Sequence, residues 1–201
     1  MRPRKLQLLH VLYLPALWFA AAVGTTASAP TAVAAPDTLR VSTAAYRVPD
    51  VKLVRQDGTA TSLEQELNDG RPVVLNFIFT SCEAICPLMT HIMAEFRRKL
   101  GAESSQVHLM SISIDPEQDT PARLREYAKR YGAGPGWNFY TGSAAASVTA
   151  QKAFNVFRGE KMDHTAVTLL RAAPGASWQR LDGFATPDDL IKQYHALVAA
   201  K

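Results

Sequence analysis

Residues 73–96 read VVLNFIFTSCEAICPLMTHIMAEF and decide the fold of this 201-residue chain. Val73 to Phe79 form a nearly continuous apolar run, which is typical of a strand buried on both faces. Pro87 suits the first residue of a helix, because the N–H that proline lacks is not needed there. Apolar residues then recur at helical spacing, at Leu88, Ile92 and Phe96. The stretch therefore predicts a buried strand, a short loop and an amphipathic helix.

Strands and helices alternate on both sides of this unit. Apolar and β-branched runs predict strands at Val51–Val54, Val107–Ile114, Trp137–Tyr140, Thr165–Leu170 and Trp178–Phe184. Gly101 is expected to end the helix that starts at Pro87. Capping residues and apolar stripes predict further helices at Ser62–Asn68, Pro121–Tyr131, Ser143–Phe157 and Pro187–Ala199. This order predicts one α/β sandwich, with a central mixed sheet and helices on both faces.

The N-terminus has the layout of a secretory signal peptide. Arg2, Arg4 and Lys5 precede an apolar run of about 18 residues, Leu6 to Val23, and small residues follow. We expect residues 1–35 to be this signal; the alternative is a retained membrane anchor, since the run is near the lower limit for crossing a bilayer. Residues 36–47 are expected to be a flexible tether, and residues 48–201 the folded domain. The protein is thus expected to be exported, and associated with a membrane only if the segment is retained.

The basic pI of about 9.2 comes from this targeting segment. Three of the 22 Lys and Arg residues lie within residues 1–35, and none of the 18 Asp and Glu residues does. The remainder carries a net charge of +1 and shows no basic patch interleaved with aromatic residues. We therefore expect no nucleic-acid partner.

Cys82 and Cys86 are the only cysteines, and they lie between the buried strand and the helix start. A helix N-terminus carries partial positive charge and free N–H groups, so it favours a thiolate. In an exported protein the alternative is a structural disulfide, but a bridge across so short a loop would add only about 2 kcal/mol. A redox pair or a metal site fits the position better.

His164 is the candidate third ligand, because it precedes the strand predicted at Thr165–Leu170, which a thioredoxin-like arrangement places beside the cysteine loop. The other histidines have simpler interpretations: His91 fits a solvent-facing position, His108 a packed position and His195 a surface position. Two thiolates and one imidazole suit Cu(I), which accepts low coordination numbers, whereas structural zinc sites use four protein ligands. Met162 is a weaker candidate, as a thioether ligand. We expect one copper ion per chain, carried as Cu(I) or Cu(II).

Three segments together resemble the Sco/SenC family: FTSCEAICP, SISIDPEQDTPARL and DHTA. The resemblance covers roughly residues 46 to 200. It implies a thioredoxin-like fold and copper binding by Cys82, Cys86 and His164. It also implies a partner, since family members deliver copper to cytochrome c oxidase or adjust the thiol state of its copper centre. Asp115 matches an aspartate that lies near the family's site; alternatively, it caps the turn before Pro116.

One departure from the family pattern lies between Phe157 and His164. The stretch RGEKMD is short there, where many members have a longer loop, and this bears on the choice of partner. The first hypothesis is a periplasmic or membrane-tethered copper metallochaperone. The second is a thiol-disulfide oxidoreductase in which Cys82 attacks and Cys86 resolves. A thiol peroxidase fits less well, because TSCEAIC does not match the loop before its single attacking cysteine.

Overall fold

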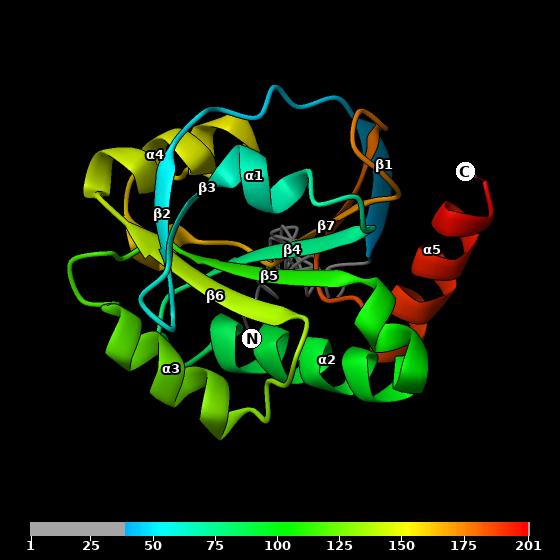
Figure 1. The fold of residues 1–201 in the computed structure, drawn as a ribbon, viewed down its shortest axis with the longest axis horizontal. Helices are drawn as coiled ribbons and strands as arrows, with labels where there is room; N and C mark the ends of the chain where they lie inside the picture. Colours follow the sequence, from blue (N-terminus) through cyan, green and yellow to red (C-terminus); the bar gives the residue numbers. More distant parts are fainter. Residues whose placement is uncertain (1–38, 201) are drawn as a thin grey trace, which may run out of the picture. The chain divides into compact units, whose positions relative to one another are not determined.

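The computed structural model describes residues 39–200, which contain an eight-stranded mixed sheet (Figure 1). The strand order is β1-β8-β7-β4-β5-β6-β2-β3. Strands β4, β5 and β6 run parallel to one another, and the other neighbouring strands pair antiparallel. The strands are β1 (Arg40–Ala44), β2 (Lys52–Arg55), β3 (Ala60–Ser62), β4 (Val73–Ile78), β5 (His108–Ser113), β6 (Trp137–Gly142), β7 (Val167–Arg171) and β8 (Trp178–Asp182).

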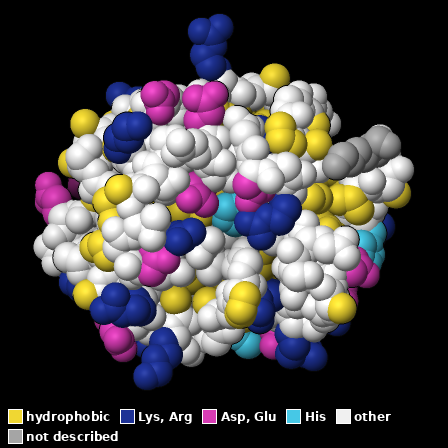
Figure 2. All heavy atoms as spheres, viewed as in Figure 1, with side chains coloured by type: hydrophobic (Ala, Val, Ile, Leu, Met, Phe, Trp, Pro, Cys, Tyr) yellow, Lys and Arg dark blue, Asp and Glu magenta, His cyan; other side chains and the backbone are white. Residues whose placement is uncertain are grey.

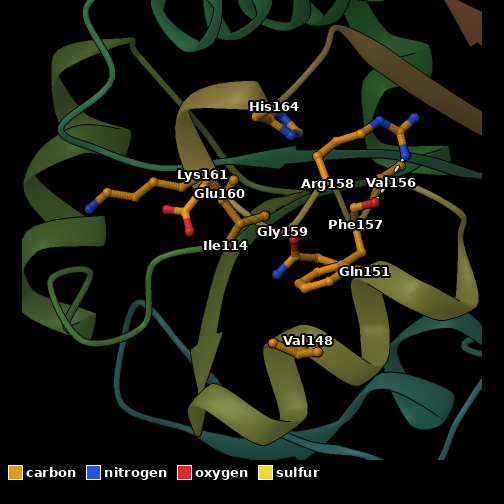
Figure 3. Close-up of a pocket in the computed structure, with 10 residues that line it drawn as sticks. All are labelled: Ile114, Val148, Gln151, Val156, Phe157, Arg158, Gly159, Glu160, Lys161 and His164. Atoms are coloured by element: carbon orange, nitrogen blue, oxygen red, sulfur yellow. Dashed lines mark hydrogen bonds between the residues drawn. The ribbon is translucent and has the colours of Figure 1, made fainter.

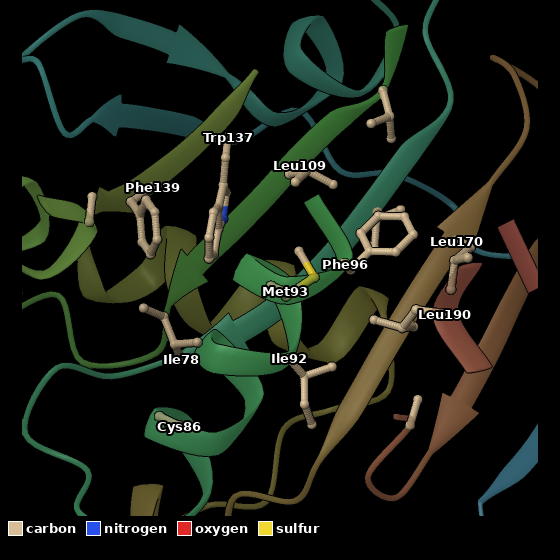
Figure 4. Close-up of a cluster of buried hydrophobic side chains, with 14 of the residues drawn as sticks. Ile78, Cys86, Ile92, Met93, Phe96, Leu109, Trp137, Phe139, Leu170 and Leu190 are labelled. Atoms are coloured by element: carbon tan, nitrogen blue, oxygen red, sulfur yellow. The ribbon is translucent and has the colours of Figure 1, made fainter. Parts of the chain in front are cut away.

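Helices cover both faces of the sheet. They are α1 (Leu63–Leu67), α2 (Ile85–Leu100), α3 (Pro121–Arg130), α4 (Ala144–Ala153) and α5 (Pro187–Ala199), with short 3-10 turns at Gly101–Gln106 and Lys161–Asp163. Helices α2, α3 and α5 contribute to one apolar cluster, part of which Figure 4 shows, and α1 and α4 contribute to the other. The described residues thus form the three-layer α/β sandwich that the sequence predicts.

The side-chain alternation along β4 explains why two layers of helices are needed. Val74 and Ile78 join the cluster of α2, α3 and α5, whereas Val73, Leu75 and Phe77 join the cluster of α1 and α4. Successive residues of a strand point to opposite faces, so a strand that is apolar throughout must be covered on both sides. All six residues of β4 are buried, as the unbroken apolar run predicts.

Side-chain caps set the starts of the helices. Thr120 accepts a hydrogen bond from the N–H of Arg123 at the start of α3, and Thr186 forms a capping box with Asp189 at the start of α5. Both helices begin at the proline after the threonine, as predicted. Helix α4 also starts as predicted after Ser143, but the predicted end at Phe157 is wrong. It ends at Ala153, because the chain leaves the helix through Asn155, whose φ is 54°.

Two other differences from the prediction bear on the site and on the edge of the sheet. Helix α2 begins at Ile85, not at Pro87, so Cys86 lies inside its first turn. Pro87 is still tolerated, because the first four N–H groups of a helix have no partner within it. Residues 40–44, predicted to be part of the tether, form β1 and pair with β8, so the sheet begins earlier than predicted.

The predicted signal peptide or anchor, residues 1–35, lies outside the described residues. Within residues 39–200, no helix combines the length and apolar character that crossing a bilayer requires.

Candidate functional site

The two cysteines lie where the central strand β4 passes into helix α2. The Cys86 side chain is 0% exposed, and its Sγ accepts a hydrogen bond from the N–H of Phe79 at 3.4 Å. Cys82 is partly exposed, and its Sγ accepts one from the N–H of Cys86, also at 3.4 Å. Both are free thiols, and Cys86 belongs to the apolar cluster of α2, where Figure 4 labels it. The pair is therefore asymmetric, with one accessible sulfur and one buried sulfur.

The surroundings of the two thiols move their pKa values in opposite directions. Partial burial works against ionisation of Cys82, but hydrogen bonds from the backbone N–H groups of Cys86, Ala84 and Ile85 outweigh it and lower the pKa of Cys82. Burial strongly raises the pKa of Cys86, and the proximity of Cys82 adds to this. At neutral pH Cys82 is thus the better nucleophile, whereas Cys86 keeps its proton.

This asymmetry predicts selective alkylation of the folded protein. We expect iodoacetamide to modify Cys82 with a half-maximal rate at a pH below the ordinary thiol pKa, because the thiolate is the reacting form. Cys86 should be modified only after unfolding, because it is buried. Mass spectrometry of proteolytic peptides across a pH series would measure both rates. Equal modification of the two cysteines in the folded protein would contradict this prediction.

Asp119 holds the cysteine loop in place from the neighbouring strand connection. It is 0% exposed and accepts hydrogen bonds from the N–H of Thr80 at 3.1 Å, the hydroxyl of Thr80 at 2.5 Å and the hydroxyl of Ser113 at 2.6 Å. Sequence reasoning missed this residue. In the sequence it is only an acidic residue directly before the Thr120 cap, and nothing nearby indicates its partner Thr80, which lies 39 positions away.

Asp115, which the resemblance places near the site, lies in the same connection between β5 and α3. Its carboxylate forms an ion pair with Lys161 at 2.6 Å, and its backbone carbonyl accepts hydrogen bonds from the N–H groups of Gln118 and Asp119. The backbone thus closes the turn, whereas the side chain reaches the 3-10 turn that precedes His164. One loop therefore contacts both segments that carry the candidate ligands.

His164 is 6% exposed and lies at the edge of a small pocket of about 90 Å³ (Figure 3). Its Nε2 lies 2.9 Å from the carbonyl oxygen of Phe77, and because a carbonyl only accepts, Nε2 carries the proton. Burial lowers the pKa of His164; the Phe77 carbonyl opposes this shift, and the charge of Arg158 adds to it. The imidazole is therefore neutral at neutral pH, with its lone pair on Nδ1.

The other candidate ligands, three histidines and one methionine, have surroundings that differ from those of His164. His91 and His195 are exposed, and His195 lies 3.1 Å from Glu103. His108 is buried, with Nε2 at 3.0 Å from the hydroxyl of Tyr140. These positions are those predicted from the sequence. Met162 is 76% exposed, so its thioether does not fill a core position.

The donor set fits a soft metal ion, although the three candidate ligands are not grouped in this structure. Within residues 39–200, no cluster of three His, Cys, Asp or Glu side chains is placed to hold a metal ion. The Cys82 sulfur lies 3.4 Å from the backbone nitrogen of Cys86, and His164 has the neutral form that binds metals, with its other nitrogen held by a backbone carbonyl as in many metal sites. Joint binding by Cys82, Cys86 and His164 stays a prediction.

Solved structures share this fold. Arabidopsis thaliana ScoI with copper bound is 26% identical, with a TM-score of 0.65 over 77% of this chain and 99% of that chain. BsSco, described as a member of the Sco family of cytochrome c oxidase assembly proteins with a disulfide switch, is 31% identical, with a TM-score of 0.65 over 78% of this chain and 95% of that chain. The fold is thus thioredoxin-like, as the resemblance implied.

Sequence comparison agrees with the structural match. The SCO1 protein homolog of Bacillus subtilis (strain 168) is 38% identical over 104 residues, which are 51% of this chain and 53% of that protein. The matched part thus spans about half of this relative. The SCO1/SenC family model matches residues 42–199, which include β2 to α5 and every candidate ligand. On this match, the chain belongs to the SCO1/SenC family.

Proposed function

We propose that this protein binds one Cu(I) ion through Cys82, Cys86 and His164 and passes it to a copper-accepting protein during cytochrome c oxidase assembly. The observation that carries the proposal is the pair of neighbouring sulfurs at the start of α2, one of them accessible and with a lowered pKa. Membership of the SCO1/SenC family supports it, because a copper-bound ScoI shares the fold.

The asymmetry of the thiols suggests how the ion would leave. Cu(I) exchanges ligands readily when an incoming thiolate can reach it, and low coordination numbers leave room for that approach. Cys82 lies at the accessible edge, so an acceptor would displace this ligand first. Cys86, held in the core by α2, would be released last. Because the three side chains are not grouped in this structure, we infer that copper draws the 81–86 and 158–164 segments together.

Export belongs to the same proposal. Residues 1–35 would direct the chain out of the cytoplasm, either as a cleaved signal or as an anchor on the outer face of the inner membrane. There the acceptor would be a respiratory copper protein. Comparing the molecular mass of the mature protein from the exported fraction with that of the full chain would test cleavage.

His164→Ala tests the third ligand. We expect the Cu(I) affinity to fall by at least about a hundredfold, since even losing a residue that supports a ligand typically costs 10–100-fold. Competition with a chromophoric Cu(I) chelator would measure the affinity in purified, reduced protein. His91→Ala is the matched control, because His91 is exposed on α2 and should leave the affinity unchanged. Equal affinities of the two variants would remove His164 from the site.

A second candidate function is thiol-disulfide exchange, favoured by the lowered pKa of Cys82 beside the buried Cys86. The Cys82 thiolate would attack a partner's disulfide, form a mixed disulfide and release one partner thiolate. Cys86 would then lose its proton and attack Cys82, releasing the second thiolate. The partner gains two electrons, the protein ends with a Cys82–Cys86 disulfide, and an external dithiol must reduce it again. His164→Ala should leave this exchange intact while it weakens copper binding.

A further inference from the structure

A pocket of about 260 Å³ lies beside the candidate site. One of its walls is Ile85, between the two cysteines in sequence, and another is Thr165, which follows His164. Phe184, from the loop after β8, and the side chains of Arg40 and Arg158 complete much of the lining. A group bound here would therefore lie next to both segments that carry the candidate ligands.

The pocket carries uncompensated positive charge. Arg40 and Arg158 are exposed, and within residues 39–200 neither has a carboxylate at ion-pair distance. Arg158 instead donates to the backbone carbonyl of Asn155 and to that of Phe157, and Figure 3 shows the second of these bonds. Asp182 also lines the pocket, but its carboxylate is paired with Arg180 at 2.9 Å.

The wider surface makes this local excess noticeable. On the face drawn in Figure 2, Lys and Arg side chains are interspersed with Asp and Glu, so that positive charge there has negative charge nearby. At the pocket, two arginines face one aspartate that is already paired. An anionic group is therefore the complement that the pocket lacks.

Exposed apolar side chains lie close in sequence to the candidate ligands, and one of them lines the pocket. Among the described residues, the large hydrophobic side chains that are exposed are Val41, Leu88, Met162 and Phe184. Three of these four belong to the site's surroundings. Leu88 follows Cys86 by two residues, Met162 precedes His164 by two, and Phe184 lines the pocket with Ile85. Of these side chains, Phe184 lines one pocket with Arg40 and Arg158, and an exposed apolar group beside arginine is typical of a protein-binding surface.

We propose that this pocket receives an acidic side chain, adjacent in sequence to an apolar one, from the protein that exchanges copper or electrons with Cys82 and Cys86. The acid contacts Arg40 and Arg158, and the apolar neighbour packs on Phe184 and Ile85. This inference rests on the proposed function, because it assumes that a partner's sulfur-bearing segment approaches the cysteines. It also predicts which partners are preferred: those with an acidic residue close to the exchanging residue and next to an apolar one.

Short peptide disulfides test the rule without copper. The probes are three peptides, each blocked at both ends and supplied as its symmetrical disulfide, with the sequences Cys-Phe-Glu, Cys-Phe-Gln and Cys-Phe-Lys. The Cys82 thiolate attacks each disulfide and releases one peptide thiol, which chromatography measures. We expect the Glu peptide to react roughly three- to tenfold faster than the Lys peptide at low salt, with the Gln peptide between them, and the ratio to shrink as salt screens the charges.

Variants test whether the pocket causes the difference in rate between the peptides. Arg158→Gln combined with Arg40→Gln should bring the Glu-to-Lys rate ratio close to one, whereas Lys192→Gln, which removes an exposed charge from α5, should leave it unchanged. Using a ratio cancels any change in the reactivity of Cys82 itself. Phe184→Ser should slow all three peptides together.

Equal rates of the three peptides with the unaltered full chain would overturn the proposal. A ratio that survives the double arginine variant would overturn it as well. Copper titration of the same proteins keeps the two ideas apart: a chain that selects the Glu peptide but binds no copper would refute the proposed function and not the pocket.

Discussion

Cys86→Ser is expected to abolish stoichiometric copper binding in the reduced protein. The substitution replaces a soft thiolate by a hydroxyl, which does not ionise at neutral pH and is a poor ligand for Cu(I). The remaining sulfur and imidazole would leave the ion two protein ligands. Cu(I) titration against a chromophoric chelator should fall from one equivalent to none, and Cys82→Ser should give the same result.

The pH dependence of binding in the unaltered protein checks the same site. Burial, more than any other effect, raises the pKa of Cys86, so its thiol is protonated at neutral pH and must lose its proton when the ion binds. Copper affinity should therefore rise with pH, by up to about tenfold per pH unit for one released proton.

Met162→Leu is the matched control for the loss of a sulfur. Its thioether is exposed near His164 in sequence, and its removal should leave one equivalent of copper bound with the original affinity. Wild-type affinity in Cys86→Ser would contradict the two-thiolate site. A loss of binding in Met162→Leu as large as that in Cys86→Ser would instead make the thioether a ligand.

The largest loss of stability is expected for Asp119→Ala. The carboxylate is fully buried and accepts hydrogen bonds from the N–H and hydroxyl of Thr80 and from the hydroxyl of Ser113. Its removal leaves the buried Ser113 hydroxyl and the half-buried Thr80 donors without this acceptor, and we expect the free energy of unfolding to fall by about 3–5 kcal/mol. Urea unfolding should show a lower midpoint at an unchanged slope.

Glu117→Ala is the control from the same loop. Glu117 is exposed, so its removal should leave the urea midpoint within experimental error of the unaltered protein. Asp119→Ala should also change the alkylation rate of Cys82, because Thr80 lies two residues before it and loses its anchor. Equal midpoints for the two variants would show that Asp119 does not hold the cysteine loop.

The sequence predicted the central part of the fold because its signals there are local. An unbroken apolar run predicts β4, and the pairs Thr120-Pro121 and Thr186-Pro187 predict the starts of α3 and α5. Strand β1 was missed because four of its five residues are exposed. An edge strand of this kind has no apolar alternation, and its pairing with β8 depends on residues far along the chain.

The candidate site was predictable to the extent that it depends on local order. The strand-to-helix loop placed Cys82 and Cys86, but the burial of Cys86 follows from α2 starting at Ile85, two residues earlier than Pro87 suggested. The contacts of Asp119 with Thr80 and of Asp115 with Lys161 join residues 39 and 46 positions apart. No local pattern encodes such contacts, because they arise only when the β5–α3 loop folds back over the site.

The burial of Cys86 also limits how far the pair can be damaged by oxidants. An oxidant meets the partly exposed Cys82 thiolate first and converts it to a sulfenic acid. The adjacent Cys86 thiol can condense with that acid, losing water and forming a disulfide that a thiol reductant reverses. Oxidation then stops before the sulfinic and sulfonic acids, which are not readily recovered. In the oxidising compartment that we propose for this protein, the buried sulfur of Cys86 thus protects the more accessible sulfur of Cys82.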